Sequence, residues 1–391
     1  MSVGNRKRLP IALGVGLALL GLSFGAGWAA GRLQNAQLSG FPLVNEILGL
    51  LRDHYLGDIP GGDELGRSMG RGLVGALGDP YSLMVDPPAR ELETNLLTGS
   101  YGGIGADIVR DSAGRLHLLP YLDGPADRAG IAEGDLLLAI DGLSLPGGTS
   151  LEEVTALLRG PSGSAVRLDV VGVGEGAASR RLQLVRETFE LPSVTSYLLP
   201  DDPATIVIRI GVFSVATAGE VGRALTSAEG RGATACVLDL RGSPGGLLEA
   251  AVDSARLFLT DGLVVSESRA DGSVLDFQVE RPGPWSSFPL AVAVDGGTAS
   301  AAEILAGALR QQYRAFLAGQ PTYGKGTVQS IFPLSDGSSL HLTTAMWTLP
   351  NGDSVPADGL APDMPLTPDP NDPDAAVRLA AERLRAAERE P

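Results

Sequence analysis

The sequence is poor in the residues that build disulfides, zinc sites and histidine-dependent catalytic triads. Its 391 residues include one cysteine, Cys236, and only three histidines, His54, His117 and His341. A single cysteine excludes an internal disulfide, and its apolar neighbours favour a small core residue. Three histidines and one cysteine do not readily supply the four ligands of a structural zinc site. We therefore predict that the protein uses no metal and no other cofactor.

Lysine is almost absent as well. The chain has two lysines, Lys7 and Lys325, and 28 arginines among its 30 basic residues. A guanidinium keeps its proton, whereas a buried ammonium group can lose it. Lys325 is therefore either a chance occurrence or a residue kept for its chemistry, such as a general base.

Positive charge is scarce overall, since the formal net charge is −16. Phosphate backbones are repelled by a body this acidic. We therefore expect no nucleic-acid partner.

Charge is missing altogether from residues 9–31. At ~1.5 Å per residue, a helix of this length spans the ~30 Å hydrocarbon core of a membrane. The basic cluster Arg6–Arg8 would keep residues 1–8 in the cytoplasm and place the body outside, in the periplasm or cell-wall space. The alternative is a cleaved signal peptide and a secreted protein, but Gly27–Ala29 is a poor cleavage site and the apolar run is long.

The remaining chain changes texture along its length. Apolar residues recur at helical spacing in a helical region, residues 41–98. Short strands separated by glycine turns follow in residues 99–188, with a short helix at Leu151–Leu158. Residues 189–368 alternate buried strands, such as Leu290–Val294, with helices. Residues 369–391 are a proline-rich stretch and a charged helix.

A glycine-rich motif opens the second region. Consecutive glycines let backbone N–H groups converge on one anion, such as a terminal carboxylate. The motif is followed by Asp123–Ile131, Glu133–Gly142 and Leu157–Gly163, and this ordered set resembles a PDZ domain of the circularly permuted bacterial type. The resemblance implies that the following residues bind a peptide tail: Tyr101, Gly102, Gly103, Ile104, Gly105 and Arg159.

The PDZ resemblance also implies a binding mode. An extended peptide would add a strand beside Ile104–Val109, in a groove bounded by the Leu151–Leu158 helix. Arg159 follows this helix, where it is either a solvated residue that favours the helix dipole or a reporter of peptide occupancy to the next domain.

A second motif, Val294–Ile304, reads as a buried strand, a glycine turn and a helix start. Ser300 would lie at the amino-terminal end of that helix, where backbone N–H groups can stabilise an oxyanion. The alternative is that Ser300 or Thr298 simply caps the helix. Lys325 follows between two glycines, and burial could lower its pKa enough to make it a general base. Gln329 lies four residues further on.

Together these segments resemble the carboxy-terminal processing, or tail-specific, proteases. The resemblance implies that Ser300 is the nucleophile, Lys325 the general base and Gln329 its orienting partner. It implies an oxyanion hole made by Ala301 with Gly245 or Gly246, between which the sequence does not decide. Many relatives carry an aspartate where Gln311 stands, so an acidic third member is in doubt.

The implied fold is a multidomain α/β protein. It has a crotonase-like β-β-α superhelix as protease core, an inserted PDZ-like β-rich domain and N-terminal helices. The implied function is a serine endopeptidase that binds carboxyl-terminal tails and forms an acyl-enzyme. The alternatives are a catalytically silent membrane-tethered PDZ adaptor and a non-peptide Ser/Lys hydrolase. The helices in 41–85 and 375–389 could also join a homodimer. A histidine triad is not expected, because His341 reads as an outward strand residue.

Overall fold

The structure is a computed structural model that describes residues 41–387, except residue 147 and residues 174–176. It divides into two units, residues 1–70 and 71–391. Helix α2 (Phe41–His54) lies in the first unit, and helix α3 (Gly62–Gly75) crosses the boundary. Both helices lie in the predicted helical region.

The predicted membrane anchor, residues 9–31, lies outside the described residues. Among residues 41–387, apart from the gaps named above, no helix combines the length and the apolar character that a membrane span requires.

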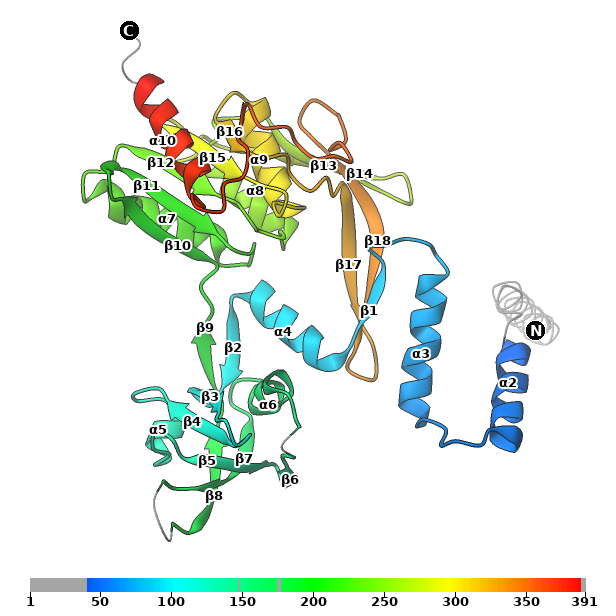
Figure 1. The fold of residues 1–391 in the computed structure, drawn as a ribbon. Helices are drawn as coiled ribbons and strands as arrows, with labels where there is room; N and C mark the ends of the chain where they lie inside the picture. Colours follow the sequence, from blue (N-terminus) through cyan, green and yellow to red (C-terminus); the bar gives the residue numbers. More distant parts are fainter. Residues whose placement is uncertain (1–40, 147, 174–176, 388–391) are drawn as a thin grey trace, which may run out of the picture. The chain divides into compact units, whose positions relative to one another are not determined.

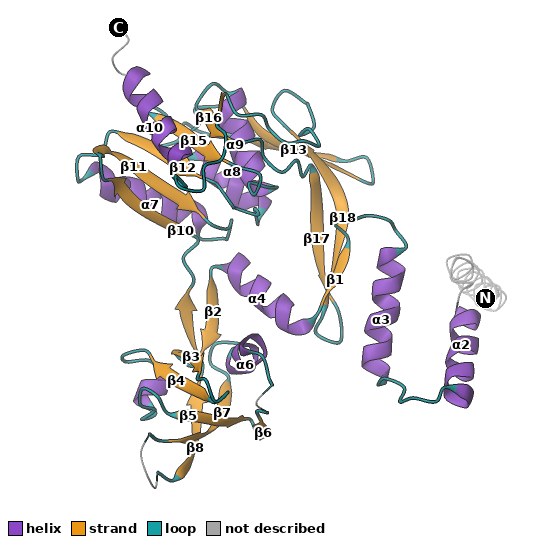
Figure 2. Cartoon of the chain, in the orientation of Figure 1, coloured by secondary structure: helices purple, strands orange, loops and turns teal. Residues whose placement is uncertain are grey.

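The second unit contains a six-stranded sheet, in the order β10-β11-β12-β15-β16-β19 (Figures 1 and 2). The neighbours from β11 to β19 are parallel, and β10 is antiparallel to β11. The strands are β10 (Val194–Leu199), β11 (Asp202–Ile210), β12 (Ala235–Asp239), β15 (Leu290–Val294), β16 (Phe316–Gly319) and β19 (Met364–Pro365).

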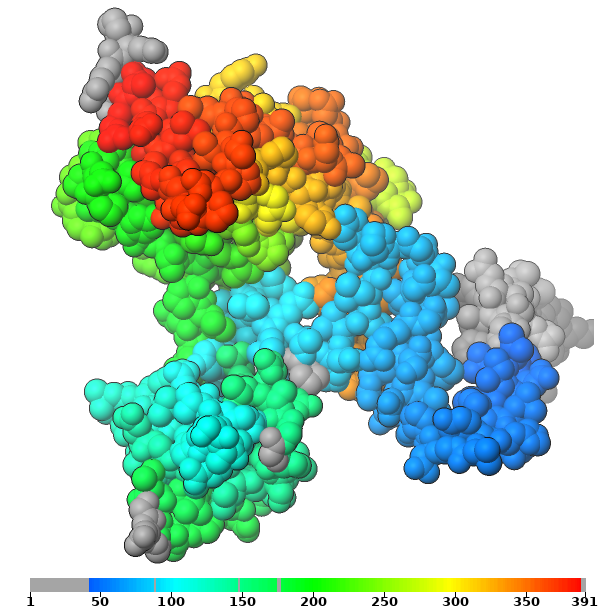
Figure 3. Space-filling model, viewed as in Figure 1, coloured from blue at the N-terminus to red at the C-terminus, as the bar shows by residue number. Residues whose placement is uncertain are grey.

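Helices cover both faces of this sheet. Helices α7 (Thr217–Glu229), α8 (Leu248–Arg256) and α9 (Ala301–Gln311) pack on one face, and α10 (Ala375–Ala387) packs on the other. Successive strand residues point to opposite faces, so Val237 contributes to the α10 side and Leu238 to the other. In the space-filling view α10, drawn red, lies at the surface of this body (Figure 3).

A second, antiparallel sheet has the order β1-β18-β13-β14, and β17 also pairs with β18. Its long β17–β18 hairpin extends from the core in Figure 2. Its strands are β1 (Leu83–Val85), β13 (Leu263–Arg269), β14 (Val274–Gln278), β17 (Thr327–Pro333) and β18 (Ser339–Thr348).

Residues 100–190 form a third group of strands around their own buried cluster. Helix α4 (Pro87–Thr98) leads into this group, and strands β2 (Ser100–Gly103) and β9 (Glu187–Glu190) pair where the chain enters and leaves it. The sheet has the order β3-β4-β5-β7-β8, with β6 beside β5. Its elements are β3 (Ala106–Arg110), β4 (Leu116–Pro120), α5 (Pro125–Arg128), β5 (Leu136–Ile140), β6 (Leu143–Ser144), α6 (Leu151–Leu158), β7 (Ala165–Val171) and β8 (Ser179–Val185).

Several predicted elements have the predicted bounds, among them the helix Leu151–Leu158 and the strand Leu290–Val294. The predicted strand Ile104–Val109 is wrong at its start, because Ile104 and Gly105 form a turn and β3 begins at Ala106. Gly105 has a φ of +68°, a left-handed conformation that a strand does not use.

Candidate active site

Ser300 lies in the turn that joins the buried strand β15 to helix α9. It is the N-cap of α9, with a φ of +54°. Non-glycine residues rarely adopt a positive φ, so the surrounding contacts must hold this backbone in place. The Ser300 N–H donates to Oε2 of Glu303 at 2.9 Å.

Lys325 lies in the loop between β16 and β17. Burial lowers the pKa of Lys325, and the carboxylates of Glu303, Asp79 and Glu93 oppose that shift. Its Nζ lies 5.3 Å from the centre of the Tyr81 ring. A lysine in such a setting can be neutral at a lower pH than an exposed lysine.

Glu303 joins the two segments that carry Ser300 and Lys325. Its side chain is fully buried. Besides the Ser300 N–H, its carboxylate accepts the N–H of Gly324 at 2.7 Å, the N–H of Lys325 at 2.9 Å and the hydroxyl of Thr322 at 2.5 Å. The sequence analysis missed this role, although an acidic residue in the otherwise apolar run Ala301–Ala306 was a signal for it.

Gly245 lies directly against the start of α9. A methyl group added at Gly245 would be 2.9 Å from the backbone nitrogen of Ala301 and 3.0 Å from Cβ of Ser300, whereas one at Gly246 would meet the backbone of Phe213. Within the described residues, no acceptor takes the N–H of Ala301, Gly245 or Gly246. The arrangement leaves amide donors free beside Ser300, and Gly245 is the glycine adjacent to Ala301.

Ser300, Lys325 and Gln329 line one cavity of about 480 Å³. The amide of Gln329 donates to the hydroxyls of Thr327 at 2.8 Å and Thr343 at 3.2 Å. No hydrogen bond joins Gln329 to Lys325 in the described part of the chain, so the orienting role of Gln329 stays a prediction.

His341 corrects one expectation. It was predicted to point outward from its strand, but its side chain is only 12% exposed and lines the same cavity as Ser300. Its Nε2 lies 3.0 Å from Oε2 of Glu93 on α4. Leu340, His341 and Leu342 are all half-buried, so burial does not alternate at this point of β18, and His341 borders the cavity beside Glu93 of α4.

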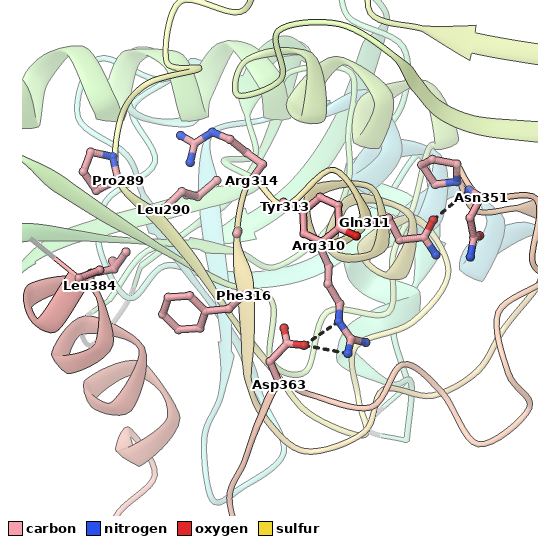
Figure 4. A pocket seen from close by; sticks show the side chains of 13 residues that line it. Pro289, Leu290, Arg310, Gln311, Tyr313, Arg314, Phe316, Asn351, Asp363 and Leu384 are labelled. Atoms are coloured by element: carbon pink, nitrogen blue, oxygen red, sulfur yellow. Dashed lines mark hydrogen bonds and ion pairs between the residues drawn. The ribbon is translucent and has the colours of Figure 1, made fainter. Parts of the chain in front are cut away.

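A larger cavity, of about 1090 Å³, lies elsewhere in the core (Figure 4). Its two arginines are engaged, since Arg310 pairs with Asp363 and Arg314 donates to backbone carbonyls. Gln311, the position at which the sequence analysis looked for an acidic third member, lines this cavity and accepts the N–H of Asn351. It is at the opposite end of α9 from Ser300, so it cannot serve as the third catalytic member.

A separate groove of about 200 Å³ lies between β3 and α6. The N–H groups of Ile104 and Gly105 have no acceptor among the described residues. The groove is lined by five of the six residues predicted to bind a tail, Tyr101, Gly103, Ile104, Gly105 and Arg159. Gly102 is the exception: its carbonyl accepts the N–H of Gly160, and a methyl group added at Gly102 would meet the backbone of Gly160.

Arg159 lies in this groove rather than free in solvent. It is half-buried, and its guanidinium carbon is 4.4 Å from the centre of the Tyr101 ring.

No group of three or more metal-ligating side chains occurs within the described residues.

Comparisons with known proteins identify the family of this chain. Residues 204–366 match Peptidase family S41. The chain is 35% identical over 295 residues to a carboxyl-terminal-processing protease of Synechocystis, an alignment that covers 74% of this chain and 68% of the relative. The chain belongs to the carboxyl-terminal processing protease family. It is therefore a serine-type peptidase of family S41, and the predicted multidomain α/β fold class is confirmed.

This carboxyl-terminal processing protease also matches a PDZ domain over part of its length, a further relative and a solved structure. Residues 120–172 match the PDZ domain. A chloroplastic C-terminal processing peptidase of Tetradesmus obliquus is 32% identical, with 80% of this chain and 72% of the relative covered. The solved photosystem II D1 C-terminal processing protease is 31% identical, with 84% of this chain and 90% of that chain covered and a TM-score of 0.47.

Proposed function

We propose that this S41 peptidase hydrolyses peptide bonds with Ser300 as nucleophile and Lys325 as general base. The observation that carries the proposal is the buried Glu303 carboxylate. It accepts the N–H groups of both residues and so holds their backbones on either side of one cavity. Burial lowers the pKa of Lys325, which favours the neutral amine that a base requires.

The chemistry follows from these groups. Neutral Lys325 takes the proton of the Ser300 hydroxyl as Oγ attacks the peptide carbonyl carbon. The N–H groups of Ala301 and Gly245 stabilise the resulting oxyanion. The carbon–nitrogen bond then breaks, and the lysine proton passes to the leaving amine. Water, deprotonated by Lys325, releases the acyl group from Ser300 and restores both residues.

The substrate backbone would lie along β17. Five consecutive residues, 327–331, line the cavity, and β17 pairs only with β18 among the described strands. Its other edge is thus open to an extended peptide, which can add by main-chain hydrogen bonds. N-methylation of alternate amides in a peptide substrate should raise KM, and a uniform lack of effect would exclude this path.

We propose that the PDZ groove holds the carboxyl-terminal tail of the substrate. The free N–H groups of Ile104 and Gly105 support this role, because they can bind a terminal carboxylate. Arg159 lies in the same groove, where its charge favours the carboxylate. In this proposal Arg159 also reports tail occupancy to the protease core, and an Arg159→Ala variant with unchanged tail-stimulated cleavage would remove that part.

Localisation is a further part of the proposal. We propose that residues 9–31 anchor the chain and place its body outside the cytoplasm, as their uncharged composition suggests. Fractionation of cells that make the full chain tests this: recovery in the cytosolic fraction contradicts it.

We also propose that the amino-terminal helices join two copies of this chain in a homodimer. Leu43, Ile47 and Leu50 of α2 are exposed, which favours a protein contact. The apolar face of α10 is not available for this role, because it is buried against the central sheet. Replacing Leu43 and Ile47 with aspartate should convert a dimer into a monomer by light scattering. A full chain that is already monomeric would contradict the proposal.

The decisive experiment compares the full-length wild type with Ser300→Ala, Lys325→Ala and Lys325→Arg on an unfolded protein substrate. We expect cleavage by the wild type alone, because arginine keeps the charge but cannot act as a base. The exposed Ser227 of α7 supplies the control, Ser227→Ala, which should remain active. Cleavage by Ser300→Ala or by Lys325→Arg would overturn the dyad.

The same assay separates the alternative functions. A wild type that binds tails but cleaves nothing would favour the silent adaptor. Hydrolysis of simple esters or amides without cleavage of peptides would favour a non-peptide hydrolase. Equal cleavage of substrates with free and amidated carboxyl termini would remove only the tail-binding part.

A further inference from the structure

Asp295 links two turns that meet beside Ser300. It is the first residue after β15, and its Oδ1 accepts the N–H of Gly297 in its own turn at 2.9 Å. The same oxygen accepts the N–H of Gly242 at 2.8 Å. Gly242 belongs to the turn that follows β12 and leads to Gly245, which we call the oxyanion turn. The turn from Asp295 to Ser300 is the nucleophile turn, so one carboxylate oxygen joins the two turns.

The two turns touch through their backbones at this point. A methyl group added at Gly297 would lie 2.8 Å from Cα of Gly242. The contact is reinforced by one backbone hydrogen bond between the turns, from the N–H of Ala299 to the carbonyl of Ser243. Two side chains add to this junction: the carboxylate of Asp295 and the hydroxyl of Thr298, which donates to the carbonyl of Leu240 at 2.9 Å.

The far side of the oxyanion turn is held by other groups. The Arg241 guanidinium pairs with Asp239 at 2.7 Å and with Asp374 at 2.9 Å. The Phe213 N–H donates to the carbonyl of Gly245. These contacts attach the turn to β12, α10 and the loop after β11, but they do not relate it to Ser300. Two side chains relate it to the Ser300 turn: Thr298, whose hydroxyl donates to the carbonyl of Leu240 at 2.9 Å, and Asp295, which accepts the N–H of Gly242 nearer to Gly245.

We propose that Asp295 is a positioning residue that fixes the spacing between the two oxyanion-hole donors, the N–H groups of Gly245 and Ala301. The inference rests on the proposed Ser300 mechanism and adds a residue to it. Asp295 acts as a hydrogen-bond acceptor, and its negative charge is not needed for this role. An asparagine oxygen can accept the same two N–H groups.

This distinction gives a sharp test with three full-length variants. Asp295→Ala removes the acceptor, and Asp295→Asn keeps it without the charge. Asp363→Ala is the matched control, because Asp363 also accepts a backbone N–H, that of Leu317 at 2.8 Å, but lines the cavity away from Ser300. Each variant is assayed for kcat and KM on a peptide, for inhibition by a peptide boronate, and for Tm.

We expect Asp295→Ala to lower kcat about 10- to 100-fold, in the range of a displaced oxyanion donor. KM should change by less than about threefold, and boronate affinity should weaken in parallel with kcat, because the boronate forms a tetrahedral adduct on Ser300. Asp295→Asn should recover most of kcat. Asp363→Ala should lower Tm and leave kcat within about twofold of wild type.

Three results would overturn the inference: full kcat in Asp295→Ala, equal losses in Asp295→Ala and Asp295→Asn, or a loss confined to KM. If Asp295→Ala does not fold, Asp295→Ser replaces it, and the kcat of Asp295→Asn still decides. The proposed mechanism is checked separately by Ser300→Ala. An active Ser300→Ala would refute that mechanism, whereas a normal Asp295→Ala beside an inactive Ser300→Ala would refute the positioning role alone.

Discussion

Two sites in the described part of the chain have backbone N–H groups without an acceptor there, and their surroundings hold them in different ways. The turns that carry Gly245 and Ala301 are fixed by hydrogen bonds that side-chain carboxylates accept: Asp295 accepts the N–H of Gly242, and Glu303 accepts the N–H of Ser300. The PDZ turn at Ile104 and Gly105 opens into a groove, and its carbonyls accept the N–H groups of Ala126 and Tyr121.

The difference corresponds to the anions that the two turns are proposed to bind. An oxyanion exists only in the transition state, so its donors must be in place before charge develops. A terminal carboxylate is a stable ligand, and an open groove can adjust to it as it binds. Dense side-chain support around the first turn and sparse support around the second are what this distinction requires.

The largest effect is expected from closing the first turn. In Gly245→Ala the new methyl group would lie 2.7 Å from the Ala299 carbonyl oxygen, at a φ of +96°. We expect kcat to fall at least about 100-fold, the loss typical of a missing oxyanion donor. Steady-state kinetics on a peptide measures it.

The control for this change is Gly352→Ala. Gly352 has a similar φ of +86°, but no atom lies within 4 Å of the added methyl group. It should cost about 1 kcal/mol of stability and leave kcat nearly intact. Equal kcat losses in both variants would mean that backbone strain, rather than the oxyanion site, explains the effect.

The second-largest effect is expected from changing Glu303, whose side chain supports the Ser300 and Lys325 segments. Glu303→Gln replaces an acceptor of four hydrogen bonds with an amide that has a single acceptor oxygen. We expect unfolding to become easier by about 3 kcal/mol, since buried bonds to a charged group are lost. Because the Ser300 and Lys325 segments would separate, kcat should fall about 10-fold or more. An unchanged free energy of unfolding, measured by chemical denaturation, would contradict this account of Glu303.

The pH dependence follows from the lowered pKa of Lys325. The base works only when neutral, so log(kcat/KM) should rise with pH and level off at the pKa of Lys325. That plateau should begin below pH 10.5, the ordinary lysine value. Below the pKa the slope should be about tenfold per pH unit. A flat profile down to pH 5 would argue against an ionisable lysine base.

The smallest effect is expected at the PDZ turn. In Gly105→Ala the methyl group would lie 2.8 Å from the Phe189 ring, which can shift, and 3.0 Å from the Pro125 ring. We expect KM to rise about three- to tenfold for substrates with a free tail, with kcat for amidated substrates unchanged. Gly142→Ala, at a φ of +85° with open space around it, is the control. A large kcat loss in Gly105→Ala would erase the contrast between the two turns.

Several helices and strands of the fold could be predicted from local sequence patterns. The buried strand Leu290–Val294 is a continuous apolar run, and the helix Leu151–Leu158 begins at Ser150, whose capping box with Glu153 is a local signal. The side of its strand on which His341 lies could not be predicted from the sequence. Alternation along β18 defines two faces, but the sequence does not state that His341 borders the cavity beside Glu93 of α4.

The candidate site divides in the same way. Ser300 and Lys325 stand in short motifs with unusual neighbours, and the sequence singles them out. Glu303 and Asp295 act through partners up to 22 and 53 residues away, so no local pattern reveals their roles. The choice between Gly245 and Gly246 also depends on contacts with the distant Ala301 and Phe213.

The sequence alone predicted the candidate reactive groups, the order of the domains and the glycine turns, because these predictions depend on residue type and near neighbours. Only the tertiary structure decided which groups lie near one another: it placed Ser300 and Lys325 on one cavity with Glu303 bonded to the backbone of both, set Gly245 beside Ala301 and turned His341 into the cavity. The reason is physical. A hydrogen bond or packing contact between distant segments depends on the path of the whole chain, which no short stretch of residues contains.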